Sequence, residues 1–126
     1  MALHKPKILL IEDDPNQVFM YETEFKAHGL EISSALNGKE GIEKAQKEKP
    51  DLILLDIVMD EMDGIEVLEQ LKEKRETKNI PIILLTNLES KEKADEGKRL
   101  GALDYVLKTK KMPREVVALV KKRLRK

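Results

Sequence analysis

The stretch Asp51-Leu-Ile-Leu-Leu-Asp56-Ile-Val-Met-Asp60-Glu-Met-Asp63-Gly64 decides which fold the chain can adopt. Its apolar run, residues 52–55, is too short for a helix and is bounded by a turn signal, so it predicts a strand buried on both faces of a sheet. This strand delivers Asp56 to its carboxyl end. Ligands and chemistry lie at the carboxyl ends of the strands in open α/β sheets. A carboxylate at this point therefore predicts a functional site.

Short apolar segments alternate with amphipathic segments along the whole chain. Strands are predicted at residues 7–11, 31–35, 52–55, 81–85 and 103–107. Helices are predicted at 15–28, from 38 onward with Ile42 and Ala45 facing inward, at 64–75 and 90–100, and from 113 onward. This alternation predicts a parallel sheet with helices on both faces. Right-handed crossovers favour the flavodoxin-like strand order 2-1-3-4-5. The predicted fold class is α/β, a doubly wound five-stranded parallel sheet with five helices.

Several helix starts carry capping residues. Asp14 precedes Pro15 and can cap the first helix, while Asn37 and Asp63 are each followed three residues later by Glu, as in a capping box. Thr86, followed by Glu89, has the same spacing and could cap the fourth helix.

The fourth predicted helix, residues 90–100, is the weakest element. Its inner stripe consists of Ala94, Gly97 and Leu100. A glycine in a helix interior costs about 1 kcal/mol relative to alanine. We expect this helix to be held by few apolar contacts.

Length and composition limit the classes of function. The chain has 126 residues and no cysteine, and its 24 basic and 24 acidic residues give a net charge of zero. It therefore has no disulfide framework and no global charge that would attract nucleic acid or a membrane surface. No run of 18 or more apolar residues occurs. We expect one cytoplasmic domain over residues 1–126, with its core at about 7–124 and no output domain.

The predicted strand order brings three carboxylates together. Strands 1 and 3 are neighbours at the switch point, so Glu12, Asp13 and Asp56 should meet in one crevice. Such carboxylates repel one another unless their pKa values rise or a cation binds among them. Oxygen ligands without cysteine or a nearby histidine favour Mg²⁺. Thr86 and Lys108 end strands 4 and 5 at the same rim, where a hydroxyl and an ammonium suit a phosphoryl group.

These features resemble the response-regulator receiver domain of two-component signalling, which is CheY-like. The resemblance covers Lys7 to Leu124. Each motif is weak alone, but the ordered set is specific. The set consists of Glu12-Asp13 after strand 1, Asp56 after strand 3, the Asp63-Gly64 turn, Thr86 after strand 4, and Tyr105 and Lys108 in Gly-Ala-Leu-Asp-Tyr-Val-Leu-Lys.

The resemblance implies that Asp56 is a phosphoacceptor for the phosphohistidine of a sensor histidine kinase or phosphotransfer protein. It also implies Mg²⁺ or Mn²⁺ held by Asp13, Asp56 and the backbone carbonyl of Val58, with Glu12 acting mainly through water. Such a domain catalyses its own phosphorylation and slow dephosphorylation, and it is not an enzyme that turns over small substrates.

The resemblance further implies a conformational switch. Thr86 and Lys108 would contact the phosphoryl oxygens, and Tyr105 would turn inward as Thr86 moves. The surface of helix 4, strand 5 and helix 5 would then be read by a downstream protein, with no nucleic acid or membrane bound directly. We expect a monomer or a weak dimer.

Three positions depart from the family pattern. Asp60 stands where proline is common, Asn87 where a small residue is usual, and Thr109 where proline often follows a cis peptide bond. A cis bond before Thr109 would cost about 3–4 kcal/mol, so we expect a trans bond and a less firmly held Lys108. Asp60 adds negative charge and removes a rigid φ, so metal binding could tighten or the loop could loosen.

Structural explanations exist for each candidate residue. Glu12 and Asp13 could complement a helix dipole, Lys108 could be a solvated surface lysine, and Tyr105 could be an edge-strand aromatic. His4 and His28 are predicted to be exposed and away from the site.

Three other functions compete with the receiver. A flavin-binding module is disfavoured because the acidic residues 12–14 would repel a phosphate. A phosphatase would need an aspartate where Val58 stands. A receiver-like adaptor that acts without phosphorylation stays open.

Overall fold

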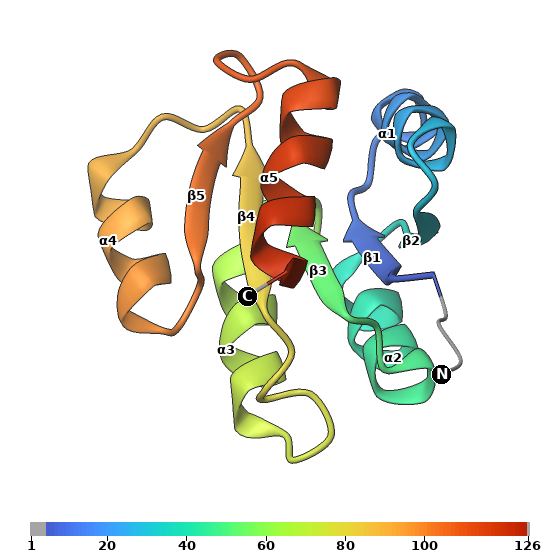
Figure 1. Ribbon diagram of the computed structural model, residues 1–126. Coiled ribbons are helices and arrows are strands. Elements are labelled where there is room, and N and C mark those ends of the chain that lie inside the picture. Colours follow the sequence, from blue (N-terminus) through green and yellow to red (C-terminus); the bar gives the residue numbers. More distant parts are fainter. Residues whose placement is uncertain (1–4, 126) are drawn as a thin grey trace.

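The strands run parallel in the order β2-β1-β3-β4-β5, as predicted, in a computed structural model that describes residues 5–125 (Figure 1). Their bounds are β1 (Lys7–Ile11), β2 (Glu31–Ala35), β3 (Leu52–Leu55), β4 (Ile82–Thr86) and β5 (Asp104–Leu107). β4 begins one residue later than predicted because Pro81 has no N–H for the ladder, and it extends through Thr86, which pairs with Leu107. β5 begins at Asp104, one residue after the predicted start.

The five predicted helices are also present. They are α1 (Pro15–Ala27), α2 (Gly38–Glu48), α3 (Gly64–Glu73), α4 (Lys91–Arg99) and α5 (Pro113–Arg125). α3 ends two residues before the predicted Arg75. None of the helices in residues 5–125 is both long and apolar enough to span a membrane.

Most of the predicted caps are confirmed. The side chain of Asp14 accepts a hydrogen bond from the Asn16 N–H at 2.9 Å, and Asn37 and Asp63 accept from the N–H three residues ahead of each. The alternative explanation of Thr86 as a helix cap does not hold. Ser90 caps α4 instead, because β4 continues through Thr86 and the chain turns before the helix begins.

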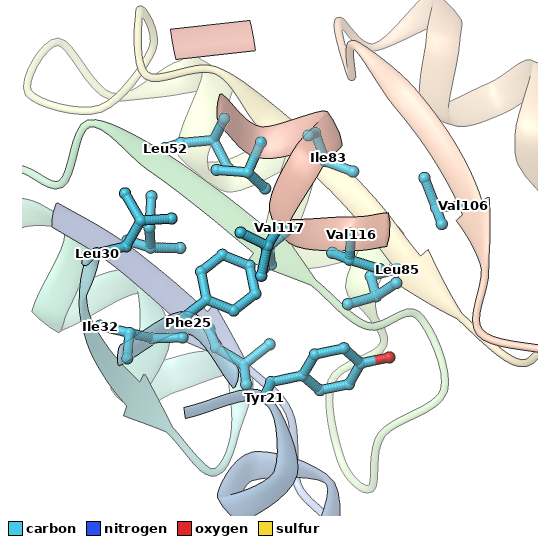
Figure 2. Close-up of a cluster of buried hydrophobic side chains, with 14 of the residues drawn as sticks. Tyr21, Phe25, Leu30, Ile32, Leu52, Ile83, Leu85, Val106, Val116 and Val117 are labelled. Atoms are coloured by element: carbon cyan, nitrogen blue, oxygen red, sulfur yellow. The ribbon is translucent and has the colours of Figure 1, made fainter. Parts of the chain in front are cut away.

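The core has one layer on each face of the sheet. On the face covered by α1 and α5, Tyr21 and Phe25 belong to a buried cluster with Leu52, Leu85 and their neighbours (Figure 2). On the other face, α2 and α3 cover the intervening strand residues, such as Leu55 and Leu84. Alternate residues of a strand point to opposite faces, so the continuous apolar runs of β1, β3 and β4 serve both layers.

α4 is packed more loosely than the other helices. Gly97 is the only residue within it that is buried, and a Cβ there would lie 2.4 Å from the Leu84 Cδ1. The prediction of few apolar contacts is confirmed. The absence of a side chain at Gly97 lets α4 approach β4 closely.

Candidate functional site

The carboxyl ends of the strands surround an open cleft of about 400 Å³. β1 and β3 are paired so that Ile11 lies beside Leu55, which places the residues that follow them side by side. All of the predicted site residues except Tyr105 line this cleft. Its lining consists of Glu12, Asp13, Asp14, Gln17, Asp56, Val58, Thr86, Asn87, Leu88 and Lys108.

Asp56 is held in one orientation directly after β3. Its backbone N–H donates to the Ile11 carbonyl at 3.0 Å, and its side-chain Oδ1 accepts from the N–H groups of Ile57 at 2.7 Å and Val58 at 3.3 Å. The residue is only 6% exposed. With Oδ1 occupied by two amides, Oδ2 is the oxygen that faces the cleft and the Lys108 ammonium, 3.3 Å away.

Lys108 bridges two buried carboxylates. Its Nζ donates to Glu12 Oε1 and to Asp56 Oδ2, and its side chain is 7% exposed. A buried charge is tolerated only when it is paired, so this arrangement neutralises the centre of the site. The reading of Lys108 as a solvated surface lysine is wrong.

The peptide bond after Lys108 is trans, as predicted, since the described residues contain no cis peptide bond. The expectation of a less firmly held Lys108 is not met. Its backbone N–H donates to the Thr86 carbonyl at 2.9 Å, which continues the pairing of β5 with β4, and the ion pairs hold its side chain.

Glu12 is in an unfavourable place for a negative charge. Burial raises the pKa of its carboxyl to about 7; the Asp56 carboxylate acts in the same direction, while Lys108 and the Asp14 N–H oppose the rise. The side chain is 2% exposed. The predicted meeting of Glu12 with Asp56 is confirmed, and additional positive charge in the cleft would favour the ionised form of Glu12.

Asp13 lies at the edge of this group. Its Oδ2 accepts a hydrogen bond from the backbone N–H of Asp60 at 3.1 Å. Within residues 5–125, no three carboxylate or imidazole groups are close enough to hold a metal ion in the present arrangement. Lys108 takes the place that a cation would take between Glu12 and Asp56.

Thr86 and Tyr105 are joined through the backbone of Leu88. The Thr86 hydroxyl, at the end of β4, accepts from the Leu88 N–H at 3.2 Å, so its own hydrogen is available to another acceptor. The Tyr105 hydroxyl donates to the Leu88 carbonyl. Tyr105 is partly buried and lies outside the cleft, where it lines a second hollow of about 280 Å³ beside α4.

Gly64 lets the start of α3 pack onto the end of β3. Its N–H donates to the Ile57 carbonyl at 2.8 Å, and a Cβ on it would lie 2.1 Å from the Asp56 carbonyl oxygen. Only glycine allows this approach. The Asp63-Gly64 turn therefore fixes the backbone that carries Asp56.

Other predicted positions lie at the periphery. Asp14 is exposed and acts as the cap of α1, and Asn87 is exposed at the mouth of the cleft. His28 is exposed and pairs with Glu24 on α1; His4 lies outside the described residues. Sequence reasoning did not identify the hydrogen bond from the Asp60 N–H to Asp13, because every residue except proline carries such a donor.

Comparisons with known proteins agree with this geometry. Residues 8–121 match the family model described as the response regulator receiver domain. The chain is 36% identical over 102 residues to the protein PilH of Pseudomonas aeruginosa, covering 81% of this chain and 84% of PilH. It is 39% identical over 119 residues to the alkaline phosphatase synthesis transcriptional regulatory protein PhoP of Bacillus subtilis, covering 94% of this chain and 48% of PhoP. The chain thus spans about half the length of PhoP.

A solved structure has the same arrangement of elements. The CheY-like response regulator receiver domain protein of Methanospirillum hungatei superposes with a TM-score of 0.90 at 27% identity, covering 97% of this chain and 95% of that one. With the match of residues 8–121 to the family model, this establishes that the chain belongs to the response regulator receiver domain family of two-component signalling.

Proposed function

We propose that the chain is a phosphorylation-dependent signalling receiver in which Asp56 accepts a phosphoryl group from a phosphohistidine. The donor would be a sensor histidine kinase or a phosphotransfer protein. One observation carries the proposal: Asp56 Oδ1 is fixed by two backbone amides while Oδ2 faces an open cleft beside the Lys108 ammonium. An oriented carboxylate next to a cation is suited to attack phosphorus.

The transfer exchanges one bond to phosphorus for another. Asp56 Oδ2 attacks the phosphorus atom, the P–N bond of the donor breaks, and its electron pair returns to the imidazole ring. The product is an acyl phosphate on Asp56. Lys108 and the hydroxyl hydrogen of Thr86 would stabilise the charge on the phosphoryl oxygens, since both groups line the cleft.

The residues at the cleft fit a bound Mg²⁺ or Mn²⁺. Asp13, Asp56 and the backbone carbonyl of Val58 would hold the ion, with Glu12 acting through water. The donors are all oxygens, and burial raises the pKa of Glu12, so positive charge is favoured there. When bound, the ion would neutralise charge on the transferred group. Lys108 would then be released from part of its pairing with Glu12 and Asp56 and become available to the phosphoryl oxygens.

The output would be a change in the surface formed by α4, β5 and α5. By analogy with other phospho-residues, the acyl phosphate carries about −1.5 to −2 charge, in place of the single negative charge of the Asp56 carboxylate. Movement of Thr86 toward it would displace Leu88, to which Tyr105 is also hydrogen-bonded. α4 follows directly and has one buried residue, so it offers little resistance. A downstream protein would bind one state of this surface better than the other.

Loss of the phosphoryl group would be slow. Val58, which is 59% exposed, and Leu88 both line the cleft. Neither side chain can orient a water molecule by hydrogen bonding. The chain would therefore be a switch that holds its phosphorylated state rather than a turnover enzyme. We also propose that it acts in the cytoplasm as a monomer or a weak dimer.

A second candidate is an adaptor that binds its partner without phosphorylation. It is favoured by the pairing of Lys108 with Glu12 and Asp56, which satisfies the site without any added group. Acetyl phosphate with Mg²⁺, followed by intact mass measurement, separates the two. A gain of one phosphoryl group that Asp56→Ala abolishes supports the receiver; no gain in the unmodified chain supports the adaptor.

A further inference from the structure

The loops that follow β1 and β3 are joined by a hydrogen bond from one backbone N–H. The N–H of Asp60, in the loop between β3 and α3, donates to Asp13 Oδ2 at 3.1 Å, although the two residues are 47 positions apart in sequence. Asp13 follows β1, so this bond connects the segment after β1 to the segment after β3, beside another hollow that Asp13 and Asp60 both line. The mechanism proposed above makes no use of it.

We propose that the Asp60 backbone amide is a positioning group for Asp13. It occupies Oδ2 and leaves Oδ1 as the oxygen that Asp13 presents to a divalent cation. This inference rests on the proposed function, because it takes Asp13 as a ligand. Hydrogen bonds from amides to carboxylates are charge-assisted, and partners that orient ligating carboxylates change metal affinity by roughly 10–100-fold.

The same loop carries the one predicted backbone ligand. Val58, whose carbonyl would bind the ion, lies two residues before Asp60. The bond to Asp13 therefore fixes the distance between a carboxylate ligand after β1 and a carbonyl ligand after β3. We infer that it presets both ligands before the ion arrives, which lowers the ordering cost of binding.

The loop needs such a restraint because its conformation is strained. Glu61, next to Asp60, has a φ of +58°, a left-handed conformation that a side chain other than glycine adopts only when its surroundings impose it. Met59, on the other side, packs partly buried against the core. Asp60 thus lies between Met59, which is anchored in the core, and Glu61, which is strained. The hydrogen bond from its N–H to Asp13 helps to hold the backbone of the loop in this conformation.

The charge of Asp60 and its N–H can be tested separately. The Asp60 side chain is exposed, and among residues 5–125 no hydrogen bond or ion pair of its carboxylate is found. Asp60→Asn removes the charge and keeps the amide. Asp60→Pro removes both the charge and the N–H, since proline has no amide hydrogen. The difference between the two variants reports the loss of the donor together with the φ that proline fixes, and exchange of the Asp60 amide hydrogen reports the donor alone.

The experiment is a calorimetric titration of Mg²⁺ into the full chain and these variants, without phosphodonor. Asp60→Pro should weaken Mg²⁺ binding about tenfold or more, and Asp60→Asn by less than about threefold, because an exposed charge contributes little. Equal affinities for Asp60→Pro and Asp60→Asn would overturn the proposal.

A second measurement does not require the proline variant to fold. Exchange of the Asp60 amide hydrogen with solvent, followed by NMR, should be slow in the unmodified chain, slower still with Mg²⁺, and fast in Asp13→Ala. Fast exchange in the unmodified chain would overturn the proposal. If Asp13→Ala also binds Mg²⁺ as well as the unmodified chain, the proposed metal site fails; if it loses binding while Asp60→Pro does not, only the inference about Asp60 fails.

Discussion

Gly64→Ala tests whether the junction between β3 and α3 holds Asp56 in place. The new Cβ would lie 2.1 Å from the Asp56 carbonyl oxygen and 2.6 Å from the Ile57 Cα. Carbon and oxygen normally approach to about 3.3 Å, and both contacts are with backbone, so the start of α3 must move away by about 1 Å. This shift weakens the 2.8 Å hydrogen bond from the Gly64 N–H to the Ile57 carbonyl.

The expected cost follows from these two effects. A lost backbone hydrogen bond costs about 1 kcal/mol and overpacking about 1–3 kcal/mol. The free energy of unfolding should therefore fall by about 2–4 kcal/mol. Phosphorylation by acetyl phosphate should also slow, because the backbone of Asp56 is displaced.

Gly97→Ala is the matched control. Its Cβ would meet Leu84 Cδ1 at 2.4 Å, but this is the free end of a side chain that can rotate. Alanine gains about 1 kcal/mol over glycine in a helix interior, which offsets the contact. Urea unfolding followed by circular dichroism should place this variant within about 1 kcal/mol of the unmodified chain. A Gly64→Ala variant as stable as Gly97→Ala would refute the reasoning.

Three further predictions concern the cleft. Lys108→Ala should slow phosphorylation by acetyl phosphate about 100-fold without weakening Mg²⁺ binding, since the ammonium competes for Glu12 and Asp56; an unchanged rate of mass gain would contradict this. Val58→Asn combined with Leu88→Glu should speed loss of the phosphoryl group, measured as decay of the phosphorylated mass, and equal decay would show that water access is not limiting. Without metal, the free energy of unfolding should fall as pH rises from about 4.5 to 7, because Glu12 in the folded chain keeps a proton that the unfolded chain has lost. Midpoints of urea unfolding measured across this pH range test the fall. Glu12→Gln should reduce the dependence of the midpoint on pH.

The fold could be predicted because its signals are local. The buried run at residues 52–55 and the caps at Asp14, Asn37 and Asp63 each follow from short-range chemistry. Parallel pairing and right-handed crossovers then leave few strand orders. Glu12 and Asp56 meet because β1 and β3 are adjacent.

The details that failed depend on competition between groups. Thr86 and Ser90 both have the chemistry of a cap, and the length of β4 decides in favour of Ser90. The cluster of carboxylates was predicted to raise pKa values or to bind a cation; the pKa of Glu12 is raised, and the part that Lys108 takes in pairing Glu12 with Asp56 was not predicted. Sequence spacing gives no measure of how far a lysine side chain reaches across a sheet.

The amide of Asp60 could not be found from residue types. Every residue except proline carries an N–H, so the contact with Asp13 depends on the path of the loop after β3. The resemblance to the receiver family drew attention to position 60 only because proline is common there. The structure gives the physical consequence, which is that replacing proline adds a donor.

The central claim is that Asp13, Asp56 and the Val58 carbonyl hold one divalent cation, and that Asp56 also accepts the phosphoryl group. A crystal structure of the chain with Mg²⁺ and beryllofluoride tests it most directly. The account predicts Mg²⁺ at about 2.0–2.1 Å from an oxygen of each of the three residues, with beryllofluoride on Asp56 contacted by Thr86 and Lys108. An ion bound elsewhere, or Lys108 still bridging Glu12 and Asp56 with no beryllofluoride on Asp56, would contradict it.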